Sequence, residues 1–135
     1  MSTNSPLSGP RPELPPELAC ALEAAQGKKA AEVTLLDLRE LGAFTDSFLL
    51  CTGFSARQVK AISDAIEEHL AGRGLRLAHR EGYDSAEWVL LDYGGFIVHI
   101  FSERARRFYA LERLWRAAHR TDFPGPENFS GAAEP

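Results

Sequence analysis

Two apolar runs, residues 88–93 and 96–101, flank the pair Gly94-Gly95 and constrain the fold more than any other stretch of the chain. Both runs are rich in β-branched and aromatic residues. Two glycines between such runs predict a two-residue turn that joins antiparallel strands. In that register the first residue of one run, Trp88, pairs with the last residue of the other, Phe101.

The alternation of side chains along a strand sorts this hairpin into two faces. The face that carries no charge is predicted to be core and holds Val89, Leu91, Tyr93, Phe96, Val98 and Ile100. The other face is apolar but includes one carboxylate and one imidazole, and it holds Trp88, Leu90, Asp92, Ile97, His99 and Phe101. We expect function on the second face.

The placement of proline predicts the limits of the folded domain. All eight prolines lie at or before position 16 or at or after position 124, and proline fits poorly inside helices and central strands. One domain is therefore expected over residues 14–121, with disordered tails at 1–13 and 122–135. No apolar run approaches the roughly 20 residues that cross a bilayer, and the amino terminus does not resemble a signal peptide. A cytoplasmic protein without a membrane partner is predicted.

Charge and cysteine content narrow the function classes. The net charge of −4 argues against nucleic-acid binding through overall charge. Residues 103–120, however, carry six arginines and two glutamates; a solvated helix face is the plain interpretation, and contact with a phosphate backbone is the functional one. Cys20 and Cys51 are too far apart for a metal or redox motif and are read as small apolar side chains.

Periodicity and capping residues predict the other elements. Helices are expected at 15–26, at 55–72 after the N-cap Ser55, and at 102–118 after the N-cap Ser102. The apolar residues of the last helix are expected to share one buried face: Phe108, Leu111, Leu114, Trp115 and Ala118. Strands are expected at 32–38, 47–51 and 75–79. With the hairpin, these elements give an α/β domain: a mixed five-stranded sheet flanked by helices.

The turn Gly53–Ser55, between a strand and a helix, offers an enzymatic alternative. Backbone N–H groups at such a turn can hold a phosphate, so Gly53, Ser55, Arg57 and Asp92 could form a nucleotide site. The plain interpretation is that Gly53 makes the turn and Ser55 caps the helix. A nucleotidyltransferase would also need two neighbouring carboxylates for its metal ions, but Asp92 stands alone on its strand.

Two residues of the mixed face have competing interpretations. His99 could act as a base with Asp92, but no nucleophile lies at a recognisable spacing, and a strand histidine is more often structural. Trp88 beside these polar groups fits a protein–protein hot spot. The alternative for Trp88 is a second core under the amino-terminal helix, and both interpretations stay open.

A series of motifs resembles the ribosomal silencing factor family, also called the Iojap family. The match covers about Leu18 to Ala118. Its motifs are Thr45-Asp46-Ser47-Phe48, Cys51-Thr52-Gly53-Phe54-Ser55-Ala56-Arg57-Gln58-Val59, Glu81-Gly82, Trp88-Val89-Leu90-Leu91-Asp92, Val98-His99-Ile100-Phe101 and Arg107-Phe108-Tyr109-Ala110-Leu111-Glu112-Arg113-Leu114-Trp115. Each motif is weak alone, but their order is specific.

The resemblance implies a fold related to nucleotidyltransferases but without their catalytic acids, in a regulator that is not an enzyme and uses no cofactor. It implies binding to the large ribosomal subunit through ribosomal protein fourteen, where the small subunit docks, so that the subunits cannot join when nutrients are scarce. It also implies homodimers. We expect the partner-binding residues to be Trp88, Leu90, Asp92, His99, Arg107 and Tyr109, with a ribosomal RNA contact through the basic last helix. A bare homodimerisation module is a third interpretation.

Overall fold

A computed structural model describes residues 14–126 and contains one mixed sheet of six strands within them. The strands are β1 (Ala31–Asp37), β2 (Ser47–Gly53), β3 (His79–Glu81), β4 (Trp88–Asp92), β5 (Phe96–Ser102) and β6 (His119–Asp122). The helices are α1 (Pro16–Gly27), α2 (Ala56–Gly72), α3 (Glu103–Tyr109) and α4 (Leu111–Leu114), with a short 3-10 helix η2 at Arg39–Leu41. The sheet order is β3-β4-β5-β2-β1-β6, in which β2 and β5 are parallel and the other neighbours antiparallel.

The mixed α/β class is confirmed, but the predicted number of strands was wrong. The sixth strand, β6, pairs with β1 from Asp37 opposite His119 to Thr34 opposite Asp122. The Thr34 hydroxyl also donates to the Asp122 carboxylate at 2.9 Å. Because β6 is short and polar at an edge, it has no apolar alternation that would reveal it. It extends one residue into the segment assigned to the C-terminal tail, while residues 1–13 and 127–135 lie outside the described residues.

The predicted hairpin is confirmed in both turn and register. Trp88 pairs with Phe101, and the pairing continues to Asp92 opposite Ile97. The Tyr93 N–H donates to the Phe96 carbonyl at 3.0 Å across the turn. Gly94 has φ +88°, a conformation that glycine adopts without steric cost.

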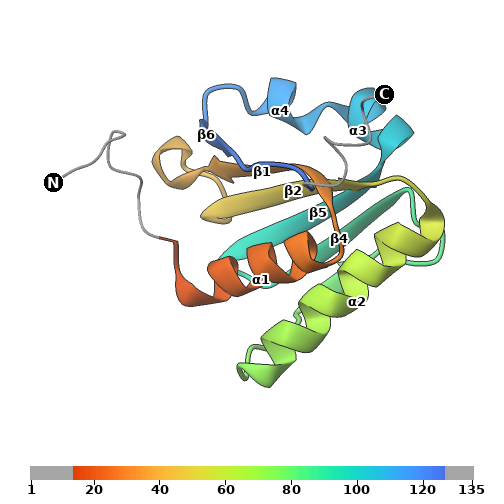
Figure 1. Cartoon of the computed structure of the whole chain (residues 1–135). Coiled ribbons are helices and arrows are strands. Elements are labelled where there is room, and N and C mark those ends of the chain that lie inside the picture. Colours follow the sequence, from red (N-terminus) through yellow and green to blue (C-terminus); the bar gives the residue numbers. More distant parts are fainter. Residues whose placement is uncertain (1–13, 127–135) are drawn as a thin grey trace, which may run out of the picture.

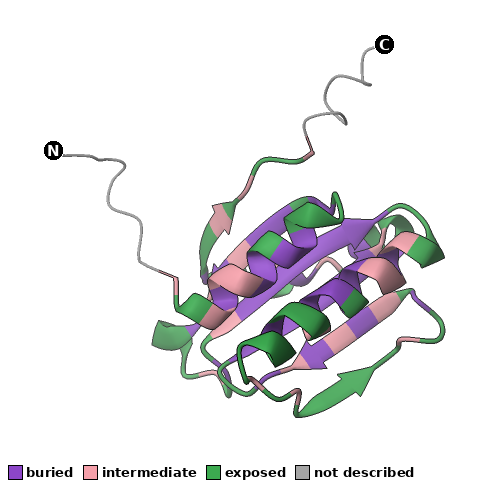
Figure 2. Cartoon of the chain, turned by 60° about the horizontal axis from the view of Figure 1, so that its bottom comes forward, coloured by how far each residue is buried: buried purple, intermediate pink, exposed green. Residues whose placement is uncertain are grey.

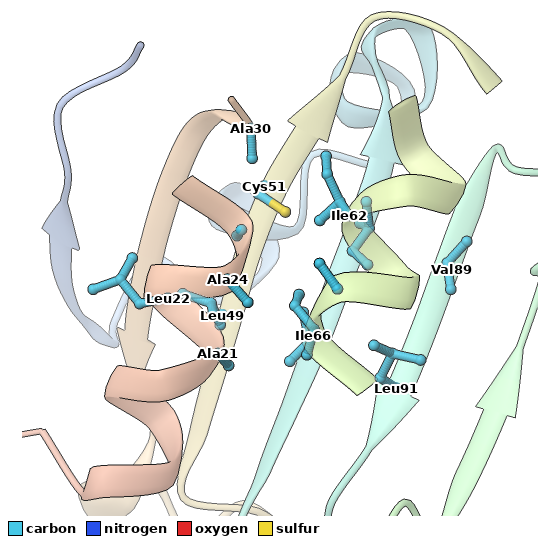
Figure 3. Packing of buried hydrophobic residues seen from close by; sticks show 14 of the residues in the cluster. Ala21, Leu22, Ala24, Ala30, Leu49, Cys51, Ile62, Ile66, Val89 and Leu91 are labelled. Carbon is cyan, nitrogen blue, oxygen red and sulfur yellow. The ribbon is translucent and has the colours of Figure 1, made fainter. Parts of the chain in front are cut away.

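The uncharged face of the hairpin lies in the larger of two apolar cores, as predicted. Both long helices, α1 and α2, cover this face of the sheet (Figures 1 and 2). Figure 3 shows Leu22 and Ala24 of α1, Ile62 and Ile66 of α2, Leu49 and Cys51 of β2, and Val89 and Leu91 of β4 in the layer between helices and sheet. The Cys51 side chain is fully buried there, and burial raises its thiol pKa to about 12.

The mixed face of the hairpin covers a second, smaller core. Its buried members are Leu36, Leu38, Phe48, Leu50, Ile97, Phe101, Ala105, Leu111 and Ala118. The chain from α3 to α4 covers this side, whereas α1 lies on the opposite face (Figure 1). A second core therefore exists, but it is not the one under the amino-terminal helix that the sequence offered as an alternative.

Two predicted elements have different limits in the structure. The single helix 102–118 is broken at Ala110, which has φ +44° and ψ 55°, and this break leaves Phe108 and Leu114 exposed instead of on a shared buried face. The edge strand predicted at 75–79 begins only at His79, because Leu75 and Leu77 pack against the core as a loop. The predicted N-caps are confirmed: Ser55 accepts from the Gln58 N–H and Ser102 from the Ala105 N–H, each at 3.0 Å.

Candidate partner-binding site

The half-buried indole of Trp88 lies between the sheet and the end of α3. Its Nε1 donates a hydrogen bond to Nδ1 of His99 at 3.0 Å. Its ring lies 4.5 Å from the ring of Tyr109 and 5.2 Å from that of Phe101, measured between centroids. Three neighbours, two on β5 and one on α3, therefore restrict the orientation of this side chain.

His99 accepts a hydrogen bond in the packed interior. Indole nitrogen can only donate, so Nδ1 of His99 accepts and the proton of the neutral ring is on Nε2. That Nε2 has no hydrogen-bond partner among the described residues, and the ring of Phe48 packs edge-on against the imidazole at 4.5 Å. Burial lowers the pKa of His99 to about 3. The imidazole is therefore neutral near pH 7.

Large apolar side chains reach solvent above the second core. Phe44 is 78% exposed, Phe108 76% and Tyr109 47%. Phe44 lies 6.5 Å from the core residue Phe48, and Phe108 lies 4.9 Å from Tyr109. We call these three, together with the half-buried Trp88, Leu90 and Trp115, the aromatic surface. Exposed aromatic groups of this kind mark binding surfaces more often than isolated exposed leucines do.

The structure brings four of the six predicted site residues together. Trp88 contacts His99 and Tyr109 directly, and Leu90 is the strand neighbour of His99. Asp92 shares their face but lies at the hairpin end of β4, where its carboxylate accepts from the Gly94 N–H at 2.8 Å. Asp92 therefore has a turn-stabilising role of its own.

Arg107 is held away from this cluster. Its guanidinium forms an ion pair with Glu32 at 2.7 Å, and this hydrogen bond lowers the pKa of the Glu32 carboxyl. Glu32 lies in β1 at an irregularity in the β1–β2 pairing and has φ +51°. The Arg107 side chain stays exposed, but its recorded partner is on β1 and not on the mixed face of the hairpin.

Sequence reasoning missed Phe44 and misplaced Phe108. Phe44 follows Gly42-Ala43 in a loop without periodicity, so only its isolated position in a polar segment could have signalled exposure. Phe108 was assigned to a buried stripe, which required a continuous helix through Ala110. Trp115 packs against Phe48 at 5.5 Å and is half-buried.

The residues of the nucleotide alternative do not meet in space. Gly53 pairs with Ser102 at one end of β5, while Asp92 pairs with Ile97 near the other end, about 17 Å away at the usual rise per residue. At the turn, the Phe54 N–H already donates to Oε1 of Gln58 at 2.7 Å. Among residues 14–126, no group of three or more metal-ligating side chains was found, nor any helix long and apolar enough to span a bilayer.

A cavity of about 600 Å³ opens on the α1 side of the sheet. Its apolar wall includes Leu18, Leu35, Tyr93 and Phe96, and Asp37 lies at its edge. None of the predicted partner-binding residues lines it. The cavity and the aromatic surface are thus on opposite faces of the sheet.

Comparison with known proteins agrees with this architecture. The family model described as "Ribosomal silencing factor during starvation" matches residues 11–134. The chain belongs to the ribosomal silencing factor family. Ribosomal silencing factor RsfS of Halalkalibacterium halodurans is 36% identical over 108 residues, covering 80% of this chain and 92% of that protein. The Bacillus subtilis protein of the same name is 37% identical, covering 78% of this chain and 89% of that protein.

A solved structure supports the family fold as well. A crystal structure of a Chromobacterium violaceum protein superposes with a TM-score of 0.74 at 30% identity, covering 86% of this chain and 97% of the other. The overall fold is therefore shared with a protein whose structure was determined by experiment.

Proposed function

We propose that this protein silences ribosomes by binding the large subunit and blocking its association with the small subunit. The partner is ribosomal protein fourteen of the large subunit, at the face where the small subunit docks, and the site of action is the cytoplasm. Membership in the ribosomal silencing factor family supports the ribosome as the target. The observation that carries the site is the aromatic surface, in which Trp88 is held by His99 and Tyr109.

The proposed mechanism is steric and involves no chemical step. Cys51 and His99 have side chains that could take part in chemistry, but both are buried in the sheet. Burial raises the pKa of Cys51 to about 12 and lowers the pKa of His99 to about 3. A neutral imidazole and a protonated thiol suit a packed scaffold better than acid–base or nucleophilic work. To block the docking of the small subunit, the protein needs only to bind the large subunit and to occupy space there.

The side chains of the aromatic surface need to lose little conformational freedom when a partner binds. A stable interface covers about 800 Å² on each partner, with aromatic anchors near its centre. Since the rings of Trp88 and Tyr109 already pack against each other at 4.5 Å, little side-chain freedom is lost when a partner covers them. We therefore assign the central anchors to Trp88 and Tyr109 and the periphery to Phe44 and Phe108.

A ribosomal RNA contact is a further part of the proposal, on a smaller basic surface than the sequence indicated. Arg106 is buried and Arg107 is paired with Glu32. The exposed arginines left at this end are Arg104, which also lies 3.5 Å from Glu87, together with Arg113 and Arg116. Each phosphate contact adds about 0.7 to 0.9 to the slope of log affinity against log salt, so a salt titration of Arg113→Ala and Arg116→Ala variants measures it.

Co-sedimentation with purified large subunits tests the proposal. Trp88→Ala and Tyr109→Ala should weaken binding by about tenfold or more, as truncated anchors do. Tyr83→Ala is the matched control, because Tyr83 packs beside α2 with Asp64 and Arg80, away from the aromatic surface. Binding by folded Trp88→Ala and Tyr109→Ala variants at the wild-type level would remove the site. Normal subunit joining at saturating protein would remove the function.

The two alternatives can be measured with the same material. Sedimentation velocity over a concentration series gives the extent of homodimer formation. Thermal stability with millimolar nucleoside triphosphate and magnesium tests the Gly53–Ser55 turn, since a ligand that binds only the native state must raise stability.

A further inference from the structure

A buried arginine lies on α3, three residues before Tyr109 of the aromatic surface. Arg106 is 4% exposed, although arginine is rarely buried without partners. Resting on the proposed function, we infer that Arg106 is a positioning residue: with Glu112 it holds the bend between α3 and α4 that places Tyr109 on Trp88. The residue itself does not touch the ribosomal partner.

The guanidinium of Arg106, which belongs to α3, has acceptors across the bend on α4 and on the sheet. It donates to Glu112 of α4 at 2.6 and 2.8 Å. It also donates to the Glu32 carbonyl at 2.7 Å and to the hydroxyls of Thr52 at 3.0 Å and Thr34 at 3.2 Å. One side chain thus joins α3, α4, β1 and β2.

The bend needs such support because its central residue is strained. Ala110 has a left-handed conformation, φ +44°, which is unfavourable for a residue with a Cβ. Residues in such conformations persist when the surrounding structure enforces them. The Arg106–Glu112 pair spans Ala110, and the Ala110 N–H donates to the Arg106 carbonyl at 3.1 Å.

The competing conformation is the continuous helix that the periodicity of residues 102–118 predicts. In an α-helix, side chains pair when they are three or four residues apart. Residues six apart, as Arg106 and Glu112 are, point about 120° away from each other at 3.6 residues per turn. The ion pair therefore forms only when the helix is broken, and it selects the bent form over the continuous one.

The position of Tyr109 depends on that choice. Tyr109 is the last residue of α3, directly before Ala110, and its ring lies 4.5 Å from Trp88. If the helix continued through Ala110, residues 110–115 would follow a different path over the second core. The Tyr109–Trp88 contact and the exposure of Phe108 would then change together.

Glu112→Ala is the informative variant, because replacing Arg106 would also remove its hydrogen bonds to Thr34, Thr52 and the Glu32 carbonyl inside the fold. We expect Glu112→Ala to lose the nuclear Overhauser contacts between the Tyr109 and Trp88 rings and to bind large subunits about tenfold more weakly. Glu112→Gln keeps one acceptor oxygen and should restore both measurements at least in part. Arg39→Ala is the control, since it removes an ion pair with Asp37 of 2.7 Å elsewhere.

The two measurements separate the positioning role from the proposed function. Glu112→Ala with intact Tyr109–Trp88 contacts would overturn the positioning role, whatever the ribosome assay gives. The positioning role would also be overturned if Arg39→Ala disturbed the Tyr109–Trp88 contacts as much as Glu112→Ala does. Wild-type protein that fails to bind large subunits would overturn the proposed function, while the ring contacts would still decide the role of Arg106.

Discussion

Nε1 of Trp88 and Nδ1 of His99 lie 3.0 Å apart on neighbouring strands, so a buried neutral histidine orients the tryptophan at the centre of the candidate site. Replacing His99 by Phe keeps the ring but removes the acceptor. We expect a loss of about 1 kcal/mol of unfolding free energy, the usual net value of one hydrogen bond, with weaker large-subunit binding. Urea unfolding and co-sedimentation measure the two effects. Unchanged binding would show that the indole does not need His99.

Acid should destabilise the protein through the same histidine. Burial lowers its pKa to about 3, against 6.5 for the free side chain. The unfolded chain therefore takes up a proton first as the pH falls below 6.5, and stability drops by up to about 1.4 kcal/mol per pH unit until the pH nears 3. Above pH 6.5 the contribution of His99 is constant.

The His99→Phe variant isolates that pH effect. It should lose less stability than wild type between pH 6.5 and 4, because carboxylates contribute equally to both proteins. Parallel slopes for the two proteins in urea unfolding over this range would contradict the assigned burial of the imidazole.

The backbone at Gly82 lies very close to the carbonyl group of Trp88. It has φ +80°, and a Cβ there would lie 2.0 Å from the Trp88 carbonyl oxygen, a backbone atom that cannot move aside. Gly82→Ala should therefore cost more than 2 kcal/mol, through strain and overlap together. Gly74→Ala is a matched control with φ +83° but nothing within 4 Å, and it should cost only about 1 kcal/mol. Equal losses in chemical denaturation would refute the steric explanation.

Phe44 offers a test of binding without a stability effect. Because its side chain is 78% exposed, Phe44→Ser should change the unfolding free energy by no more than about 0.5 kcal/mol. If the aromatic surface extends to Phe44, binding to large subunits should weaken several-fold in co-sedimentation. Full binding by this variant would confine the site to the Trp88–Tyr109 side.

The two cysteines should differ in reactivity. Cys51 is fully buried with a pKa of about 12, whereas Cys20 is half-buried on α1. An aromatic disulfide reagent at pH 8 should modify Cys20 quickly and Cys51 only as fast as the protein unfolds, since the thiolate is the reacting species. Mass spectrometry measures the rate of modification at each thiol. Fast modification of both would contradict the burial of Cys51 between the helices and the sheet.

The hairpin, its uncharged core face and the helix caps could be predicted because their signals are local. Alternation around Gly94-Gly95 determines the register, and a serine before an apolar stripe marks a helix start. Strand β6 could not be predicted in this way, because its four polar residues form a strand only through pairing with β1. The break at Ala110 was also invisible, since alanine favours a continuous helix and gives no local signal of a left-handed conformation.

The candidate site was predicted at the level of its face and only partly at the level of its residues. Composition pointed to Trp88, Leu90, His99 and Tyr109, which lie together. Arg107 was chosen for its charge, and the sequence has no local sign that Glu32 would hold it. Whether the grouped residues bind the ribosome stays a prediction for the experiments above.

The sheet separates two apolar layers, and the aromatic surface belongs to the smaller one. The larger layer, with both long helices, holds most of the buried side chains. Exposed side chains of the aromatic surface, such as Phe44 and Phe108, can therefore change to suit a docking partner with little penalty to folding. For the same reason, a laboratory library of substitutions in the aromatic surface could change binding affinity while the larger core under α1 and α2 stays as it is.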